Sequence, residues 1–205
     1  VRALFEFWPR KVLLGKHLFR GPMRVLPGKP GEHVLLGNRK YGGNIVFRPN
    51  DDATLTVIDE IGIEEYLNGV LPKEMSPDWP IEALKAQAVV SRTFALTNLG
   101  KFSKAGFDLS NDDKSQIYSG IEVESAAVRR AVRETAGEVL YWDGKMLPVY
   151  FHSACGGRTN SPKLVWGGGE AGLTPLRGVK DKYCRDSPHY RWSAYFRTDD
   201  ILAAL

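Results

Sequence analysis

Glu74 is the residue best suited to acid–base chemistry in this sequence. It lies in the gap expected between two helices, next to Met75 and close to Trp79. Apolar neighbours disfavour a charged carboxylate, so they raise its pKa and let it hold a proton near neutral pH. A protonated carboxylic acid beside an aromatic ring suits cleavage of a glycosidic bond. The alternative is a structural glutamate that caps or neutralises a helix end.

Polar side chains interrupt the apolar face of the longest expected helix. Arg92 falls within a stripe of apolar positions, and Gln87 and Ser91 flank it; the stripe is formed by Leu84, Ala88, Ala95 and Leu99. A guanidinium group on such a face must be paired. Arg92 therefore either joins a carboxylate and locks the helix to a loop, or contacts a substrate. We take Gln87, Ser91 and Arg92 as candidate substrate-binding residues.

Two further segments contain candidate binding residues. Gln116 and Tyr118 either line a sugar cleft, by hydrogen bonding and stacking, or terminate a strand. Ser153 lies beside a histidine and a cysteine, but neighbouring strand side chains point to opposite faces, which disfavours a nucleophilic dyad there. Gly156 and Gly157 fit a strand end packed close to a ligand or a helix. We include all five among the candidate substrate-binding residues.

Two cysteines leave a choice between a disulfide and a metal. Cys155 and Cys184 would form one disulfide in an oxidising compartment, and we favour that pairing. His152 and His189 lie near them in the sequence, so these four residues also form a ligand set suited to structural zinc. Two unpaired buried thiols are the third alternative. We expect no required cofactor.

Composition excludes several classes of protein. The chain has 205 residues, 43% of them hydrophobic, which is enough for a full core. Its net charge of +4 is spread along the sequence without basic runs, which argues against nucleic acid as a partner. No apolar stretch reaches the roughly 20 residues that cross a bilayer. The chain begins at Val1, and any export signal would precede it.

Periodicity predicts an α+β fold. Short apolar runs through about Asp59, separated by turn residues, indicate an N-terminal β-meander. Helices are expected over Ile63–Leu71, stopped by Pro72, then over Pro80–Leu99 and Glu124–Thr135. The remaining expectations are an irregular Gly106–Gly120, a hairpin of Val139–Trp142 and Met146–Phe151 around Asp143-Gly144, and a final helix from Asp199 to Leu205. We expect a mixed β-sheet with the long central helix packed on it, followed by the hairpin and loops.

Five sequence boxes resemble the stage II sporulation protein D and LytB domain family. Two form its signature: Tyr66-Leu67-x-Gly69-Val70-Leu71-Pro72-x-Glu74-Met75, and the run from Trp79 to Ala95. The others are Tyr41-Gly42-Gly43, Gln116-Ile117-Tyr118-x-Gly120 and His152-Ser153-x-Cys155-Gly156-Gly157-x-Thr159. They follow the family's order from Tyr41 towards the C-terminus, and such a series is more specific than one short motif. Residues 1–205 then form a single domain, in which 1–40 belong to the same sheet or to a small β-rich extension.

The resemblance implies a secreted lytic transglycosylase that acts on peptidoglycan glycan strands stripped of their stem peptides, as in sporulation or cell division. The family's catalytic glutamate corresponds to Glu74. The implied location is extracytoplasmic, either periplasmic or cell-wall associated. Some members are described as modifiers of an autolytic amidase, so the alternative is a non-catalytic glycan-binding module that stimulates such an enzyme. Some members bind zinc just before the Gln-x-Tyr box, but residues 107–115 contain neither His nor Cys.

Overall fold

The computed structural model describes residues 5–8, 11–14, 17–29, 31–121, 125–167 and 174–199. By its internal contacts the chain divides into two compact units, Val1–Leu147 and Pro148–Leu205. The first unit contains the described strands and the three longer helices. Helices and antiparallel sheets occur together, which confirms the α+β class. A single domain over the whole chain stays a prediction.

The β-meander forms small antiparallel sheets. One contains β1 (Phe5–Trp8), β2 (Lys11–Leu14) and β3 (His17–Arg20); a second contains β4 (Met23–Val25), β7 (Asn44–Pro49) and β8 (Leu55–Glu60); β5 (Val34–Leu36) pairs with β6 (Arg39–Tyr41). All strand pairings among the described residues are antiparallel, whereas we expected a mixed sheet with parallel and antiparallel pairs. Short turns explain this for successive strands such as β7 and β8, because antiparallel neighbours need only short connections, whereas β4 pairs with β7 across the β5–β6 hairpin.

A buried cluster holds the N-terminal strands together. It consists of Val12, Met23, Ile45 and Phe47. Ile45 and Phe47 are two positions apart on β7 and therefore point to the same face of the sheet. Their partners on β4 are Val25 and Met23. Burying a side chain of this size stabilises the fold by about 1.5–3 kcal/mol.

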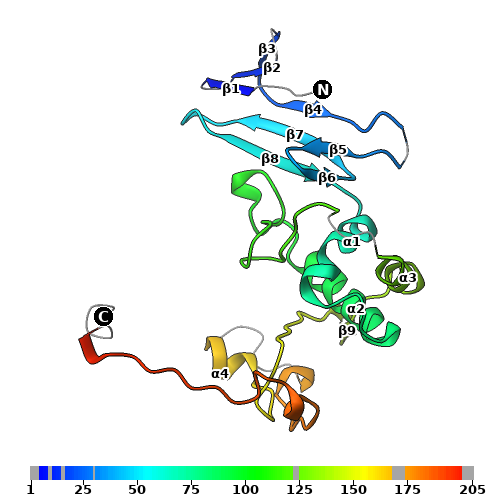
Figure 1. Ribbon diagram of the computed structural model, residues 1–205, viewed down its shortest axis with the longest axis vertical. Helices are drawn as coiled ribbons and strands as arrows, with labels where there is room; N and C mark the ends of the chain where they lie inside the picture. Colours follow the sequence, from blue (N-terminus) through cyan, green and yellow to red (C-terminus); the bar gives the residue numbers. More distant parts are fainter. Residues whose placement is uncertain are drawn as a thin grey trace. The chain divides into compact units, whose positions relative to one another are not determined.

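Three helices form the second core of this unit. They are α1 (Ile63–Glu74), α2 (Ile81–Thr97) and α3 (Ala126–Glu134), and Figure 1 shows them grouped together. Leu67, Val70 and Leu71 of α1 are fully buried with Ala88 of α2 and Val128 of α3. We expected the long helix to pack on the sheet, but its principal partners are α1 and α3. Its small residues explain this, since Ala88 and Ala95 allow close approach of another helix.

Helix α1 continues beyond Pro72, contrary to the predicted end at Leu71. A proline lacks the N–H that would bond the carbonyl four residues earlier, so the helix loses this one bond, and it ends two residues later at Glu74. The Met75 N–H still donates to the Leu71 carbonyl at 2.9 Å, which closes the last turn. Glu74 therefore belongs to the final turn of α1 and not to the gap between the helices.

The ends of α2 and α3 follow local sequence signals. Pro80 is the N-cap of α2 where we expected the first helical residue, and Gly100 adopts φ +78° just beyond its end. The Ser125 hydroxyl accepts a hydrogen bond from the Val128 N–H at 3.3 Å and caps α3. Of the predicted range of α3, Glu124 lies outside the described residues, and Gly137 has φ +75° after the last turn.

The predicted hairpin is present but short. Strands β9 (Tyr141–Trp142) and β10 (Lys145–Met146) flank Asp143 and Gly144, whose φ angles of 50° and 74° are those of a type I′ turn. One further bond joins the Leu147 N–H to the Leu140 carbonyl at 2.8 Å. Pro148 has no N–H to extend the ladder, so the strands end earlier than predicted.

The second unit consists of loops and short helices. It contains α4 (Pro162–Trp166) and the 3₁₀ turns η2 (Thr174–Leu176) and η3 (Tyr183–Asp186). We did not predict α4, although Ser161 accepts a cap bond from the Leu164 N–H and Pro162 occupies the first turn. Of the predicted helix Asp199–Leu205, residues 200–205 lie outside the described residues.

Candidate functional site

Glu74 is half-buried at the C-terminal end of α1. Burial raises the pKa of its carboxyl group above the ordinary value, as expected. The negative end of the helix dipole also disfavours a carboxylate at this position. Trp79, which we expected close to Glu74, has a side chain that is 56% exposed. The environment of Glu74 therefore favours a proton-bearing acid at a pH where most glutamates are ionised.

Tyr66 connects Glu74 to Gln116. Tyr66 and Glu74 both lie on α1. Burial is the main cause that raises the pKa of the Tyr66 hydroxyl, and the negative charge of Glu74 is the second. That hydroxyl donates a hydrogen bond to Oε1 of Gln116 at 3.3 Å. Gln116 is 1% exposed, and its Nε2 has no hydrogen-bond partner in the structure. The amide is thus oriented by Tyr66 and lies inside the protein.

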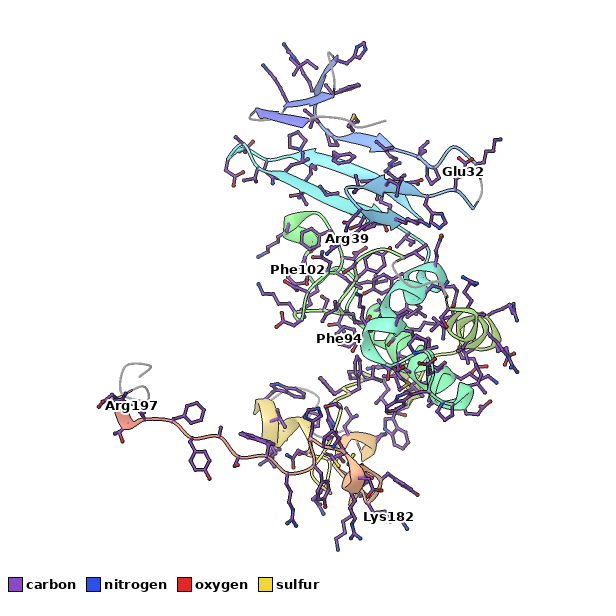
Figure 2. All side chains as sticks on the ribbon, in the orientation of Figure 1. Glu32, Arg39, Phe94, Phe102, Lys182 and Arg197 are labelled. Carbon is purple, nitrogen blue, oxygen red and sulfur yellow. The ribbon has the colours of Figure 1, made fainter. Side chains whose placement is uncertain are left out.

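The irregular segment 106–120 places Gln116 beside α1. Its entrance is fixed by Phe102, labelled in Figure 2, whose ring stacks on that of Phe107 with centroids 5.3 Å apart. The Gly100 N–H donates to the Asp108 carboxylate at 3.0 Å, and the Ser110 hydroxyl donates to Asp112 at 2.7 Å. These local bonds replace regular secondary structure and give the segment a defined path.

Tyr118 is part of the core. Its ring lies 5.1 Å from the ring of Tyr66, and its hydroxyl donates to Oδ2 of Asp59 at 2.6 Å. Gly69 permits this packing, because a Cβ there would lie 2.5 Å from Cε2 of Tyr118. Tyr118 is 7% exposed. It therefore supports Tyr66 and Gln116 from within the protein, while stacking of its ring on a sugar stays a prediction without a contact to support it.

Arg92 is buried away from Glu74. It is 1% exposed and donates to both carboxylate oxygens of Glu64, from Nε at 2.9 Å and from Nη2 at 2.6 Å. Its Nη1 donates to the carbonyl of Glu138 at 3.0 Å. Glu64 lies in the first turn of α1 and Glu74 ends the helix, a separation of about 15 Å along its axis. The contacts are those of the helix-locking ion pair, one of the two roles considered for Arg92.

Gln87 and Ser91 bond to each other. Nε2 of Gln87 donates to the hydroxyl of Ser91 at 3.1 Å, across one turn of α2. Ser91 is fully buried, and Gln87 is half-buried. Of this pair, Gln87 alone retains exposed surface for a ligand. Their role in substrate binding stays a prediction.

The remaining candidate binding residues belong to the second unit. Ser153 is exposed, and Gly156 and Gly157 have φ angles of 66° and 105° that favour glycine. A Cβ at Gly157 would lie 2.7 Å from the hydroxyl oxygen of Tyr190. The double glycine thus allows close packing within this unit. Its approach to a substrate stays a prediction.

Cys155 and Cys184 lie close together, and both contact the carboxylate of Asp181. Their sulfur atoms are 3.7 Å apart and both cysteines are free. Oδ2 of Asp181 lies 3.1 Å from the sulfur of Cys155 and 3.3 Å from that of Cys184. The bond to Asp181, assisted by burial, raises the pKa of the Cys155 thiol. The favoured disulfide is not formed, and the group that could bind a metal contains Asp181 in place of His152 and His189.

Sequence reasoning missed four residues that organise these sites. Tyr66 and Asp59 support the glutamine and tyrosine of the irregular segment, while Glu64 and Asp181 complete the arginine and cysteine clusters. Asp181 had a usable signal, since it precedes Cys184 by the same interval as His152 precedes Cys155. Glu64 had a weaker one, because a buried arginine requires a carboxylate.

Known proteins match much of the chain. Residues 51–142 match the family model described as SpoIID, stage II sporulation protein. An uncharacterized protein of Brachyspira hyodysenteriae is 43% identical over 73% of this chain and 40% of its own length. An amidase enhancer of Bacillus subtilis is 34% identical over 56% of this chain and 15% of its own, and stage II sporulation protein D of Bacillus subtilis is 26% identical over 72% and 47%. The chain spans less than half the length of these relatives.

No helix among the described residues has the length and apolar character to cross a membrane.

Proposed function

Because the chain belongs to the stage II sporulation protein D family, we propose that it is a lytic transglycosylase with Glu74 as its acid and base. Its relationship to that family and to an amidase enhancer gives it a cell-wall-related role. The substrate is the peptidoglycan glycan strand lacking stem peptides. The observation that carries the proposal is the half-buried Glu74 with its raised pKa.

One carboxyl group suffices for the reaction. Protonated Glu74 gives its proton to the oxygen of the bond between N-acetylmuramic acid and N-acetylglucosamine, and the bond from that oxygen to C1 breaks. The carboxylate then takes the proton of the muramic C6 hydroxyl, whose oxygen bonds to C1. The products are a free N-acetylglucosamine hydroxyl and a 1,6-anhydro end, and Glu74 regains its proton. No water and no second carboxylate are consumed, unlike in most glycoside hydrolases.

Nearby polar groups have supporting roles. Tyr66 lies within electrostatic reach of Glu74 and holds Gln116, which is 1% exposed. We therefore assign Gln116 to positioning Tyr66 from inside the protein. Gln87 is the candidate for sugar contact, because it keeps exposed surface on α2. Tyr118 acts by positioning the ring of Tyr66.

The substrate implies an extracytoplasmic location. Peptidoglycan lies outside the cytoplasmic membrane, so the enzyme acts as a secreted, periplasmic or cell-wall associated protein. Sporulation and cell division are the processes in which strands of this kind are remodelled.

Mass spectrometry of digested strands tests the proposal. Peptide-free glycan strands are incubated with the wild-type chain, with Glu74→Gln and with Glu82→Gln, which replaces an exposed glutamate at the start of α2. Wild type and the Glu82 variant should release products with anhydromuramic ends, and Glu74→Gln should release none. Reducing ends in place of anhydro ends would mean hydrolysis by water. A Glu74→Gln variant that still cleaves strands would refute the assignment of the acid.

A second function is favoured by the similarity to an amidase enhancer. In that case the domain binds glycan strands without cutting them and stimulates a cell-wall amidase. Peptide-free strands that stay intact with both wild type and Glu74→Gln, together with faster release of stem peptides from peptide-bearing peptidoglycan when a cell-wall amidase is added, would support this function. The two functions therefore predict different products: anhydromuramic ends from peptide-free strands in one case, and stem peptides from peptide-bearing peptidoglycan in the other.

A further inference from the structure

We propose that Cys155, Asp181 and Cys184 bind a Zn²⁺ ion, with the exposed His152 turning in as the fourth ligand, and that this ion ties together the loops of the second unit. The inference concerns Pro148–Leu205 alone and does not rest on the role of Glu74. Two thiolates, one carboxylate and one imidazole are all ligands that Zn²⁺ takes in proteins.

The three atoms have the spacing of one face of a coordination tetrahedron. Two thiolates, each about 2.3 Å from a tetrahedral zinc ion, lie about 3.8 Å apart. The sulfur atoms of Cys155 and Cys184 are 3.7 Å apart. The distances from Oδ2 of Asp181 to the two sulfurs, 3.1 and 3.3 Å, are those of thiol hydrogen bonds and need to open by only a few tenths of an ångström. The ion can therefore enter without a rearrangement of the loops.

The spacing in the sequence supplies ligands in two similar pairs. Asp181 precedes Cys184 by three positions, and His152 precedes Cys155 by three positions. Short intervals of this kind are typical of structural zinc sites, because one turn of chain then presents two ligands to one ion. His152 is exposed and lies outside the three-residue group, so its imidazole must turn towards the ion to bind it. Its place three positions before Cys155 makes it the candidate for the fourth position, whereas no contact among the described residues brings the His189 ring to this group.

Backbone bonds hold the two pairs together before any ion binds. The Asp181 N–H donates to the Gly157 carbonyl at 3.0 Å, and the Thr159 N–H donates to the Val179 carbonyl at 3.0 Å. The Gly157 N–H points at the sulfur of Cys155 at 3.4 Å, which helps to fix this sulfur in the loop. The ligands are therefore pre-positioned, and binding need not order the loops from a free chain.

The position of Asp181 favours a metal over a disulfide. Its Oδ1 accepts the Tyr183 N–H at 2.8 Å, which fixes the carboxylate and directs Oδ2 between the two sulfurs. A disulfide would remove both thiol hydrogens and leave Oδ2 facing two sulfur atoms with no donor. A zinc ion would bond all three atoms at once. The carboxylate thus has a role in the metal site and none in the disulfide.

Metal analysis of the full chain tests the site. The reduced protein is loaded with zinc and dialysed, its zinc content is measured by inductively coupled plasma mass spectrometry, and its affinity is measured by competition with a zinc-binding dye. We expect one zinc per chain for wild type, and none for Cys155→Ser or Cys184→Ser. Asp181→Asn keeps the shape of the side chain and should weaken binding at least about tenfold, because even outer-shell partners of a zinc site contribute that much. His152→Ala should also weaken it.

Two variants serve as controls. Asp186→Asn changes the aspartate of η3, which lies outside the cluster, and His189→Ala removes the histidine that is not brought to it, so both variants should bind zinc like wild type. Cobalt in place of zinc should give the visible spectrum of a tetrahedral thiolate site. Wild-type zinc content no higher than that of the Cys155→Ser/Cys184→Ser double variant would overturn the proposal. So would unchanged affinity in Asp181→Asn, or a protein isolated with an intact Cys155–Cys184 disulfide and no zinc.

Discussion

Arg92 of α2 and Glu64 of α1 form a two-point ion pair at the first turn of α1, with donor–acceptor distances of 2.9 and 2.6 Å. The same carboxylate accepts the Gly137 N–H at 3.1 Å. The guanidinium is 1% exposed, whereas the Glu64 side chain is 37% exposed. Removing Glu64 therefore leaves a buried charge on Arg92, whereas removing Arg92 leaves a carboxylate that is partly exposed to water.

Removing the carboxylate should be more damaging than removing the guanidinium. Glu64→Ala leaves a buried positive charge without its partner, and we expect a loss of about 3 kcal/mol in the free energy of unfolding, at the low end for buried pairs because Glu64 is partly exposed. Arg92→Met leaves a carboxylate that water can reach, so the loss should be smaller. Urea unfolding measures both. Arg130→Ala breaks an exposed pair with Glu134 and should cost less than about 1 kcal/mol. Equal losses for Glu64→Ala and Arg130→Ala would contradict this picture.

Glu74 should lower stability as the pH rises. Burial raises the pKa of Glu74 in the folded state, so the folded chain holds this proton more tightly than the unfolded chain. The unfavourable contribution appears between the ordinary glutamate pKa, about 4.3, and the raised folded value, and stays constant above it. Glu74→Gln should therefore be more stable than wild type at neutral pH, with a difference that vanishes below pH of about 4. Thermal unfolding across this range measures it, and a difference independent of pH would contradict the raised pKa.

Gly69→Ala should disturb the site through Tyr118. The added Cβ would lie 2.5 Å from the tyrosine ring and 2.7 Å from the Gly120 carbonyl, so the ring must shift. Overpacking of this kind costs about 1–3 kcal/mol in unfolding free energy. Strand cleavage should fall as well, since Tyr118 supports Tyr66. Gly62→Ala places a Cβ in open space and is the matched control. If both variants unfold alike in urea, close packing at Gly69 is not the cause.

Tyr66 and Gln116 should be energetically coupled. Tyr66→Phe leaves the buried Oε1 of Gln116 without its donor, which costs about 1–3 kcal/mol. Gln116→Met removes the amide, and the double variant leaves neither partner unpaired. The summed losses of the single variants should therefore exceed the loss of the double variant by about 1 kcal/mol. A double-mutant cycle in urea measures the coupling, and strict additivity would show that the bond does not contribute.

Local signals in the sequence determined much of the fold. Asp143-Gly144 gave the type I′ turn, and Gly100 and Gly137 marked where α2 and α3 end, because those conformations depend on the residues themselves. Glu74 was also recognisable from local sequence, because the apolar residues Met75 and Trp79 lie within five positions of it. The predicted end of α1 at Leu71 was wrong, because Pro72 lies within the last turn, which the Met75 N–H still closes.

Tertiary structure alone decided which partners the polar residues have. Tyr66 and Gln116 are 50 positions apart, Tyr118 and Asp59 are 59 apart, and Cys155 meets Asp181 across 26. Such pairs depend on how the helices and loops pack, and no periodicity in either segment records the other. The sequence therefore determined that Glu74, Arg92 and the two cysteines require special surroundings. Packing decided that Arg92 would bind Glu64, and that the cysteines would meet a carboxylate.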